Sequence, residues 1–464
     1  MTSRPAGLDE RVLEVAARVA RAGGRALIVG GYVRDRFLGL DTKDLDIEVH
    51  GLEIARLEEV LRSFGEVIAV GRAFGVLRVK GIDIDFSLPR RDSKTGRGHR
   101  GFLVELDPGL GYTEAARRRD LTMNSMALDP LTGEVLDPHG GREDIARGIL
   151  RATDPQHFAE DSLRGLRVAQ FRARFELVPD AELRRLSAAL DLSDLPAERV
   201  YEELKKLLLK GRRPSLGFEF LQETRLLRFF PELAAMVGVP QDPEWHPEGT
   251  VWEHTLLVLD EAARDRSGSE DEDLVLLLGA LLHDVGKPST TFEEGGRIRS
   301  PSHEDVGVPI ARAFLERLRT PLAITEAVAA LVRHHLAPAQ FAQGNASPKA
   351  YRRLARKLEA AGTTVAMLHR VARADHFGRG TPDALARRFP AGDEFLRHAS
   401  ELAVELEPPA DAVLGRHLIA RGYAPGPWFG KVLERCREIQ DETGWTAPDR
   451  ILEKALEAVP PESP

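Results

Sequence analysis

The sequence predicts an α+β protein, with a small mixed or antiparallel sheet near the N-terminus followed by all-α segments. Residues 45–49 and 82–86 alternate between apolar and acidic side chains, which is the period of a strand buried on one face. Residues 9–22 place valines at helical spacing and end at two glycines. From 153–175 onward the periodic segments have helical spacing. These observations define the fold class.

Length and composition indicate an ordinary globular protein of several domains. The 464 residues, 42% hydrophobic and 30% charged, suffice for three or four domains. No apolar run approaches the length of a membrane span, and the first residues lack the apolar core of a secretion signal. Cys436 is the single cysteine, which excludes an internal disulfide framework and a cysteine-rich zinc site. We expect a cytoplasmic protein without a membrane partner.

The net charge of −8 argues against binding nucleic acid over the whole surface. Basic residues nevertheless cluster in 90–119, 205–228 and 349–357. Such clusters are compatible with gripping one folded RNA at defined places. For any single cluster, a solvated helix face explains the charges equally well.

The most informative stretch begins with the apolar run 27–29, which ends at Gly30 and Gly31 and continues into a segment of helical spacing that contains Arg34. The glycines therefore lie where a strand turns into a helix. Glycine permits close approach, and the N–H groups at a helix N-terminus favour negative charge. This turn is a candidate phosphate site.

Three aspartates follow on the alternating segments. On a strand, Asp44 and Asp46 would share one face, where paired carboxylates suit a hard cation such as Mg²⁺. Asp85 would join them if its strand pairs with theirs. The same alternation also describes any half-solvated strand, and Asp85 has a purely structural alternative.

The combination of Gly-Gly, V-R-D and D-x-D on the next strand resembles the head of the class II tRNA nucleotidyltransferases and bacterial poly(A) polymerases, within the DNA polymerase beta superfamily. The segment RRDLTMNSMA at 118–127 resembles another motif of that family. Arginines there suit a triphosphate because guanidinium donates in a fixed fork. The resemblance implies a head over residues 1–152, catalytic Asp44, Asp46 and Asp85 with Mg²⁺, and nucleotide binding by Gly30, Gly31, Arg34, Arg118, Arg119, Asp120 and Asn124.

Residues 153–175 are predicted to form one helix, in which Asp161 and Arg164 share a face. They match the E-D-x-x-R motif of the family, which implies that Asp161 and Arg164, with Arg167 nearby, select CTP and ATP by imitating a base's pairing edge. An ordinary salt bridge between Asp161 and Arg164 is the alternative. The helical neck would span 153–244. Residues 89–117 are predicted to be mostly a mobile loop, which in the family helps to switch nucleotide choice.

Histidines and aspartates beyond the neck follow the order H, HD, H, HH, D, which resembles the HD superfamily of metal-dependent phosphohydrolases. Imidazole and carboxylate ligands suit divalent transition metals such as Mn²⁺ or Ni²⁺. One site is implied for His254, His283, Asp284 and Asp375, and a second for His303 with His334 or His335. The HD domain would span 245–400 and a helical tail 401–464.

The resemblance therefore implies an enzyme that adds CCA to the tRNA 3′ end from CTP and ATP, with an HD phosphohydrolase activity. The head could instead add only the terminal A, with a partner enzyme supplying CC, or it could be a poly(A) polymerase. A third alternative is an inactive RNA-binding head beside an active HD site. The HD substrate, the number of metals and the oligomeric state stay open.

Overall fold

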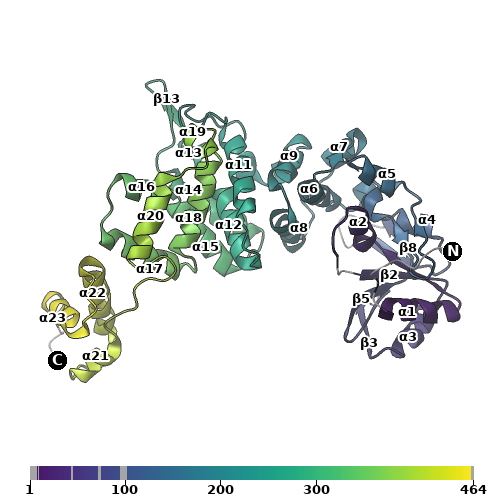
Figure 1. Ribbon diagram of the computed structural model, residues 1–464, viewed down its shortest axis with the longest axis horizontal. Coiled ribbons are helices and arrows are strands. Elements are labelled where there is room, and N and C mark those ends of the chain that lie inside the picture. The colour runs from purple at the N-terminus through teal and green to yellow at the C-terminus, as the bar shows by residue number, and fades with distance from the viewer. Residues whose placement is uncertain (1–7, 9, 43–44, 72–74, 95–101, 461–464) are drawn as a thin grey trace. The chain divides into compact units, whose positions relative to one another are not determined.

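The computed structural model describes residues 8, 10–42, 45–71, 75–94 and 102–460 (Figure 1). The chain divides into two compact units, 1–229 and 230–464, which are described separately. The first contains a mixed sheet with helices and the second is almost entirely helical. The α+β prediction is confirmed.

A sheet of seven strands forms the centre of the first unit, in the order β3-β4-β5-β2-β1-β8-β9. Its described pairs are antiparallel except β2 with β5, which is parallel. The strands are β1 (Arg25–Val29), β2 (Leu45–His50), β3 (Val67–Gly71), β4 (Val76–Val79), β5 (Ile82–Ser87), β8 (Ala127–Leu128) and β9 (Val135–Leu136). The parallel pair sets two predicted acidic strands side by side.

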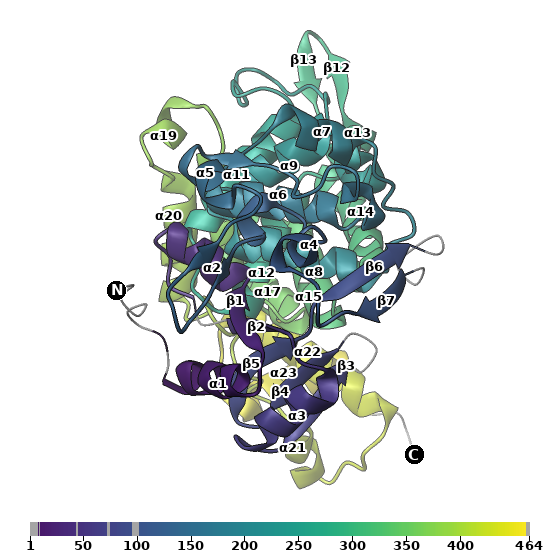
Figure 2. The same ribbon diagram turned by 90° about the vertical axis from the view of Figure 1, so that its right-hand side faces the viewer.

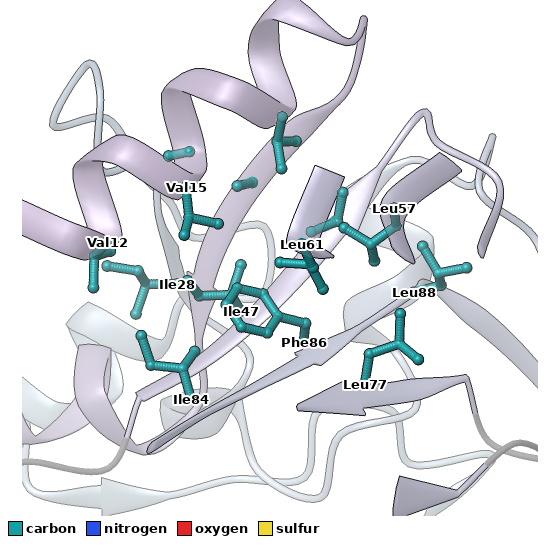
Figure 3. Close-up of a cluster of buried hydrophobic side chains, with 14 of the residues drawn as sticks. Val12, Val15, Ile28, Ile47, Leu57, Leu61, Leu77, Ile84, Phe86 and Leu88 are labelled. Carbon is teal, nitrogen blue, oxygen red and sulfur yellow. The ribbon is translucent and has the colours of Figure 1, made fainter. Parts of the chain in front are cut away.

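Two helices supply much of the core on one face of this sheet (Figure 3). Helix α1 (Glu10–Arg21) buries its valines there, as the spacing predicts, and α3 (Ile54–Arg62) buries Leu57 and Leu61. Ile47 and Phe86 from the alternating strands meet them, because period-two burial sends one side of each strand inward. The acids of those strands consequently lie on the opposite face.

A helical region follows the sheet in the first unit. Besides α1 and α3, the helices of this unit are α2 (Gly31–Phe37), α4 (Tyr112–Ala116), η2 (Thr122–Asn124), α5 (Gly141–Ala146), η3 (Phe158–Glu160), α6 (Arg164–Phe175), α7 (Ala181–Ala188), α8 (Ala197–Lys210), α9 (Pro214–Glu223) and η4 (Leu226–Phe229). A short parallel pair, β10 (Ile149–Leu150) with β11 (Val178–Pro179), joins the two regions.

The interval predicted to be mostly loop instead contains a β-hairpin. Strands β6 (Arg90–Lys94) and β7 (Phe102–Leu106) pair antiparallel (Figure 2). The apolar run of β7 is short, and charged residues dominate β6, so neither strand has the alternation on which the prediction relied. The connecting residues 95–101 lie outside the described part of the chain.

The second unit packs α11, α12, α15 and α18 against one another, and a smaller apolar cluster joins α21, α22 and α23. Its helices are α10 (Pro231–Ala234), α11 (Val251–Arg264), α12 (Glu270–Leu282), α13 (Lys287–Thr290), α14 (His303–Arg317), α15 (Leu322–His334), α16 (Ala337–Gln343), α17 (Pro348–Ala360), α18 (Val365–Phe377), α19 (Pro382–Leu385), α20 (Pro390–Glu401), α21 (Gly415–Ala420), α22 (Pro427–Thr443) and α23 (Pro448–Ala458). Strands β12 (Phe292–Glu294) and β13 (Arg297–Arg299) form a hairpin. Among the described residues, none of the helices has the length and apolar character needed to cross a membrane.

The basic face of α17 is turned toward α22 rather than left wholly to solvent. Lys349 lies 2.7 Å from the Glu442 carboxylate, and Arg356 lies 3.0 Å from that of Asp441. Arg352 donates to the backbone carbonyl of Asp441. Three of the basic residues in the predicted cluster 349–357 therefore bind α17 to α22 of the tail, within the second unit.

Candidate functional site

The turn between β1 and α2 is built as the glycine pair predicts. Gly30 has a φ of 72°, a left-handed conformation that favours glycine. A Cβ atom added to Gly30 would lie 3.1 Å from Nη1 of Arg119 and 3.9 Å from Oδ2 of Asp46. The turn thus brings three groups together: a glycine backbone that a phosphate can approach closely, the cation of Arg119 and the carboxylate of Asp46.

The parallel pairing of β2 with β5 places Asp46 opposite Asp85 in the register. This is the arrangement on which the prediction of a third carboxylate depended. Oδ1 of Asp85 accepts a hydrogen bond from Nε of Arg78 at 2.6 Å. Asp44, the other predicted acid, lies outside the described residues.

A cleft of about 980 Å³ opens beside this turn. Its lining includes ten predicted nucleotide-binding residues and one predicted catalytic acid, which are Gly30, Gly31, Arg34, Arg118, Arg119, Asp120, Asn124, Asp161, Arg164, Arg167 and Asp46. Asp85 does not line it. Other basic residues of the clusters 90–119 and 205–228 also line the cleft. Arg174 and Arg199 line it as well, although the sequence analysis gave neither of them a nucleotide-binding role. Such a concentration of cations suits a polyphosphate.

Buried polar residues form a continuous network along the floor of the cleft. Arg34 donates to Oδ1 of Asn124 at 2.8 Å, and Asn124 donates to Oδ1 of Asp120 at 2.9 Å. Arg167 donates to Oδ2 of Asp120 at 2.7 Å. Burial would raise the pKa of Asp120, but the charge of Arg167 and the hydrogen bonds lower it to about 2. Asp120 therefore stays ionised and orders two arginines of the cleft.

Lowering the pH is expected to reduce the stability of the head, because Asp120 becomes protonated. Its pKa is about 2 in the folded chain against an ordinary 3.8, so its contribution to stability is complete above about pH 4 and is lost as the pH falls through about 2. The free energy of unfolding should therefore be roughly 2 kcal/mol lower for Asp120→Asn than for the wild type at pH 7. Urea unfolding of both proteins should show this gap narrowing steadily below pH 4; a gap independent of pH would contradict the ionised state.

Asp161 and Arg164 line the cleft in a different local structure from the one predicted. Helix α6 begins at Arg164, and Asp161 precedes it in extended conformation. Asp161 accepts a hydrogen bond from the backbone N–H of Leu163 at 3.1 Å and lies 3.3 Å from the Arg199 guanidinium. Arg164 donates to the backbone carbonyls of His157 and Arg118, each at 2.7 Å. Asp161 pairs with Arg199, so the alternative of a simple bridge between Asp161 and Arg164 does not describe this site.

The second unit holds a buried cluster of imidazoles and carboxylates. Oδ1 of Asp284 lies 3.2 Å from Nε2 of His303, and its Oδ2 lies 3.2 Å from Nε2 of His283. His254 joins through Asp375, whose Oδ1 is 3.1 Å from Nε2 of His254. These residues come from α11, α14, α18 and the end of α12, so that packing of the helices assembles the predicted set.

Three of the histidines are held in one orientation. His283, His303 and His335 each have Nδ1 at 2.8 Å from a backbone carbonyl three residues earlier. That carbonyl can only accept, so Nδ1 carries a proton, and in the neutral imidazole Nε2 is left with its lone pair. Nε2 of His303 and Nε2 of His335 nevertheless lie 3.2 Å apart. Two facing lone pairs at that distance suit a shared cation.

Other atoms of the cluster also fit a bound metal. Nε2 of His283 lies 3.2 Å from Oδ2 of Asp284, and both atoms are buried; Nζ of Lys287 also lies 2.7 Å from that oxygen. Burial would raise the pKa of Asp284, but the neighbouring His283 and Lys287 hold it well below its usual range. Nitrogen and carboxylate donors of this kind bind divalent transition metals. The cluster therefore meets the chemical requirements of the predicted metal centre.

The structure corrects the prediction for the adjacent pair His334 and His335. His335 is 2% exposed and joins a possible metal group with Asp284 and His303. His334 is half-buried and belongs to none of the possible metal groups among the described residues. Neighbouring positions on a helix point about 100° apart, so only one of the pair faces the cluster.

The sequence analysis missed the residues that support His254. Oε1 of Glu248 lies 2.7 Å from Nδ1 of His254 and 2.9 Å from Nδ1 of His246. A carboxylate in this position fixes the imidazole's orientation and raises its basicity. Glu248 is one of 73 acidic residues in the chain and follows no spacing that would have singled it out.

Family models of known proteins match parts of both units. Family models described as the poly A polymerase head domain and the HD domain match residues 26–151 and 251–376. A third, described as a probable RNA and SrmB-binding site of polymerase A, matches 181–237. These matches include the cleft residues from Gly30 to Asn124 and the histidine cluster from His254 to Asp375, whereas Asp161, Arg164 and Arg167 lie between the matched ranges.

Full-length relatives and solved structures extend the likeness. A multifunctional CCA protein of Xanthomonas campestris pv. campestris is 34% identical over 426 residues, covering 88% of this chain and 96% of the relative. One from Stenotrophomonas maltophilia is 39% identical over 317 residues, covering 67% and 75%. The Bacillus stearothermophilus CCA-adding enzyme in complex with CTP has a TM-score of 0.65 at 22% identity, covering 97% of each chain. The Thermotoga maritima CCA-adding enzyme complexed with tRNA has a TM-score of 0.59 at 17% identity, covering 98% and 97%. The chain belongs to the family of the multifunctional CCA proteins.

Proposed function

We propose that this protein adds CCA to the 3′ end of tRNA, using CTP and ATP, and that its second unit hydrolyses phosphate esters. The relatives named multifunctional CCA proteins support the first activity, and the HD domain match supports the second. The observation that carries the proposal is the cleft, in which a glycine turn, Asp46 and an array of arginines line one space. That combination is suited to a nucleoside triphosphate.

In the proposed reaction, the tRNA 3′-oxygen forms a bond to the α-phosphorus of the nucleotide, and pyrophosphate leaves. Carboxylate oxygens favour Mg²⁺, and Asp44, Asp46 and Asp85 are the residues that would hold it. When bound, the metal stabilises negative charge on the attacking and leaving oxygens. Arg118 and Arg119, with the glycine turn, bind the triphosphate and direct its α-phosphate toward the tRNA end.

Base selection is proposed for Asp161 and Arg164. A carboxylate can accept from the exocyclic amino group that C and A share, while an arginine donates to the ring acceptor beside it. The support is that both residues line the cleft near Asp120 and Arg167. Their present partners are Arg199 and two backbone carbonyls, so recognition of a base requires some of these bonds to be exchanged.

Asp161→Ala is expected to reduce discrimination between CTP and UTP by about 10- to 100-fold, since one good bidentate contact is worth about 1–3 kcal/mol. Single-turnover rates with each of the four nucleotides on a tRNA lacking CCA measure this ratio. Asp191→Ala is the matched control, because Asp191 is exposed and accepts from Ser193 in the same unit. Equal loss with all four nucleotides would exclude the selecting role.

The second activity is proposed for the histidine cluster, with Mn²⁺ or Ni²⁺ held by His254, His283, Asp284 and Asp375, and by His303 with His335. When bound, the metal activates water against a phosphate ester. Attachment to a tRNA 3′-end enzyme suggests 2′,3′-cyclic phosphates of damaged tRNA as one substrate. Failure of Mn²⁺- or Ni²⁺-loaded protein to hydrolyse such ends would exclude that substrate.

The domain limits 1–152, 153–244, 245–400 and 401–464 remain our proposal. The family model matches at 26–151 and 251–376 lie within the first and third of these domains and support them.

The deciding experiment supplies purified protein with Mg²⁺ and labelled CTP or ATP on tRNA transcripts ending at the discriminator base, at CC and at CCA. Addition of CCA to the first and arrest on the third is the expected result. Addition of A to the CC-ended transcript alone would identify an A-adding enzyme with a separate CC-adding partner. Continued addition of A would identify a poly(A) polymerase, and no addition would leave the HD site as the active centre.

A further inference from the structure

A buried carboxylate beside the cleft has no part in the proposed reaction. Glu48 follows Asp46 by two residues on β2, and its side chain is 1% exposed. Successive side chains of a strand alternate, so Glu48 shares its face with Asp46 and His50, opposite the apolar residues that enter the core. An ionised carboxylate at such a position is costly unless it is paired.

The partners of Glu48 include the two arginines proposed to bind the triphosphate. Its Oε2 lies 2.7 Å from Nη2 of Arg118 and 3.9 Å from Nη2 of Arg119. Its Oε1 lies 3.2 Å from Nε2 of His50, which in turn has Nδ1 at 2.9 Å from the carbonyl of Leu110. The Glu48 carboxylate is therefore held from two sides, by the arginines on one and by His50 on the other.

The guanidinium of Arg119 links this carboxylate to the glycine turn. Its Nη2 faces Glu48, while its Nη1 lies 3.1 Å from the position of a Cβ on Gly30. The group is planar and rigid, so holding one nitrogen determines where the other points. Nε of Arg119 is buried without a hydrogen-bond partner among the described residues, which leaves donor capacity for a ligand.

We propose that Glu48 is a positioning residue for nucleotide binding, which holds Arg118 and Arg119 with their remaining N–H groups directed at the triphosphate beside Gly30. Glu48 also offsets the repulsion between the two adjacent cations, so that both can point into the cleft before a ligand arrives. The proposal rests on the function proposed above, because it assigns Glu48 a role in the same nucleotide site.

The test compares two variants that separate charge from size. Glu48→Gln keeps the length of the side chain but removes its charge, and Glu48→Asp keeps the charge on a shorter side chain. We expect Glu48→Gln to raise the KM for both CTP and ATP by about tenfold or more, because the charge-assisted hydrogen bond to Arg118 and the ion pair with Arg119 are lost. Glu48→Asp should recover part of that loss. Glu58→Gln is the matched control, since Glu58 makes an exposed ion pair with Arg62 at 2.7 Å in the same unit.

Steady-state kinetics on tRNA lacking CCA give KM and kcat, and thermal unfolding of each variant reports stability. A residue that only fills space would tolerate glutamine better than aspartate, so a KM that is normal in Glu48→Gln and raised in Glu48→Asp would overturn the proposal. A KM for Glu48→Gln within twofold of the wild type would also overturn it. If the wild type itself adds no nucleotide, the proposed function fails and this inference fails with it.

Discussion

Asp46→Asn is expected to lower the rate of nucleotide addition by at least about a thousandfold. Asp46 is the described member of the D-x-D pair that lines the cleft, and it lies opposite Asp85 across the parallel strands. Asparagine has the same shape but carries no negative charge, so it is a poor ligand for Mg²⁺. Single-turnover CTP addition at saturating Mg²⁺ measures the loss.

Asp83→Asn provides the matched control for this variant. Asp83 is an exposed residue of β5, two positions before Asp85, and it lies outside the residues that line the cleft. It should retain addition within about twofold, and both variants should keep the thermal unfolding transition of the wild type. If Asp46→Asn were to retain more than about a tenth of the wild-type rate, Asp46 would not be a catalytic ligand.

Asp284→Asn is expected to weaken binding of Mn²⁺ or Ni²⁺ by at least about a hundredfold and to abolish phosphate-ester hydrolysis. Asp284 belongs to two of the three possible metal groups among the described residues, and its two oxygens face His283 and His303. Nucleotide addition should persist, because the cleft residues all belong to the other compact unit. Calorimetric titration of metal-stripped protein measures affinity independently of activity.

His334→Gln is the matched control for the metal centre. It changes the histidine that lies next to His335 in sequence but outside the metal groups, and metal affinity should be unchanged. Asp284→Asn also leaves Lys287, 2.7 Å away, without its carboxylate, so thermal unfolding in a chelator should accompany the titration. Metal affinity retained in Asp284→Asn, with a folded protein, would rule out the assigned centre.

Local periodicity was sufficient to predict β2 and β5, whereas most of the cleft residues were predicted from motifs that resemble those of the tRNA nucleotidyltransferases. The alternation at 45–49 and 82–86 depends on burial of one face, and the buried Ile47 and Phe86 follow it. Glu48 is an exception to this pattern. A polar residue on an alternating strand is expected to face water, but the side chain of Glu48 is buried. Arg118, 70 residues away in sequence, covers it, and no local pattern contains that information.

The sequence did not determine two further features, the first for a local reason and the second for a long-range one. The carboxylate of Asp161 accepts from the N–H of Leu163, a side-chain bond that competes with the helix and delays its start to Arg164. The choice between His334 and His335 depends on the rotation of α15 about its axis, which packing against neighbouring helices sets. Motifs that resemble those of known families predicted the ligand types in both sites, but contacts distant in sequence decide which atoms meet.

The register of β2 and β5 places two carboxylates, those of Asp46 and Asp85, directly opposite each other. Like charges directly opposite on neighbouring strands destabilise a sheet. Ile47 and Phe86 nevertheless hold the register, because a slip of one residue would turn them out of the core. Burial on one face thus forces Asp46 and Asp85 together on the other. Under the proposed mechanism these acids hold the metal, so catalysis and thermal stability place opposing demands on the same pair of strands.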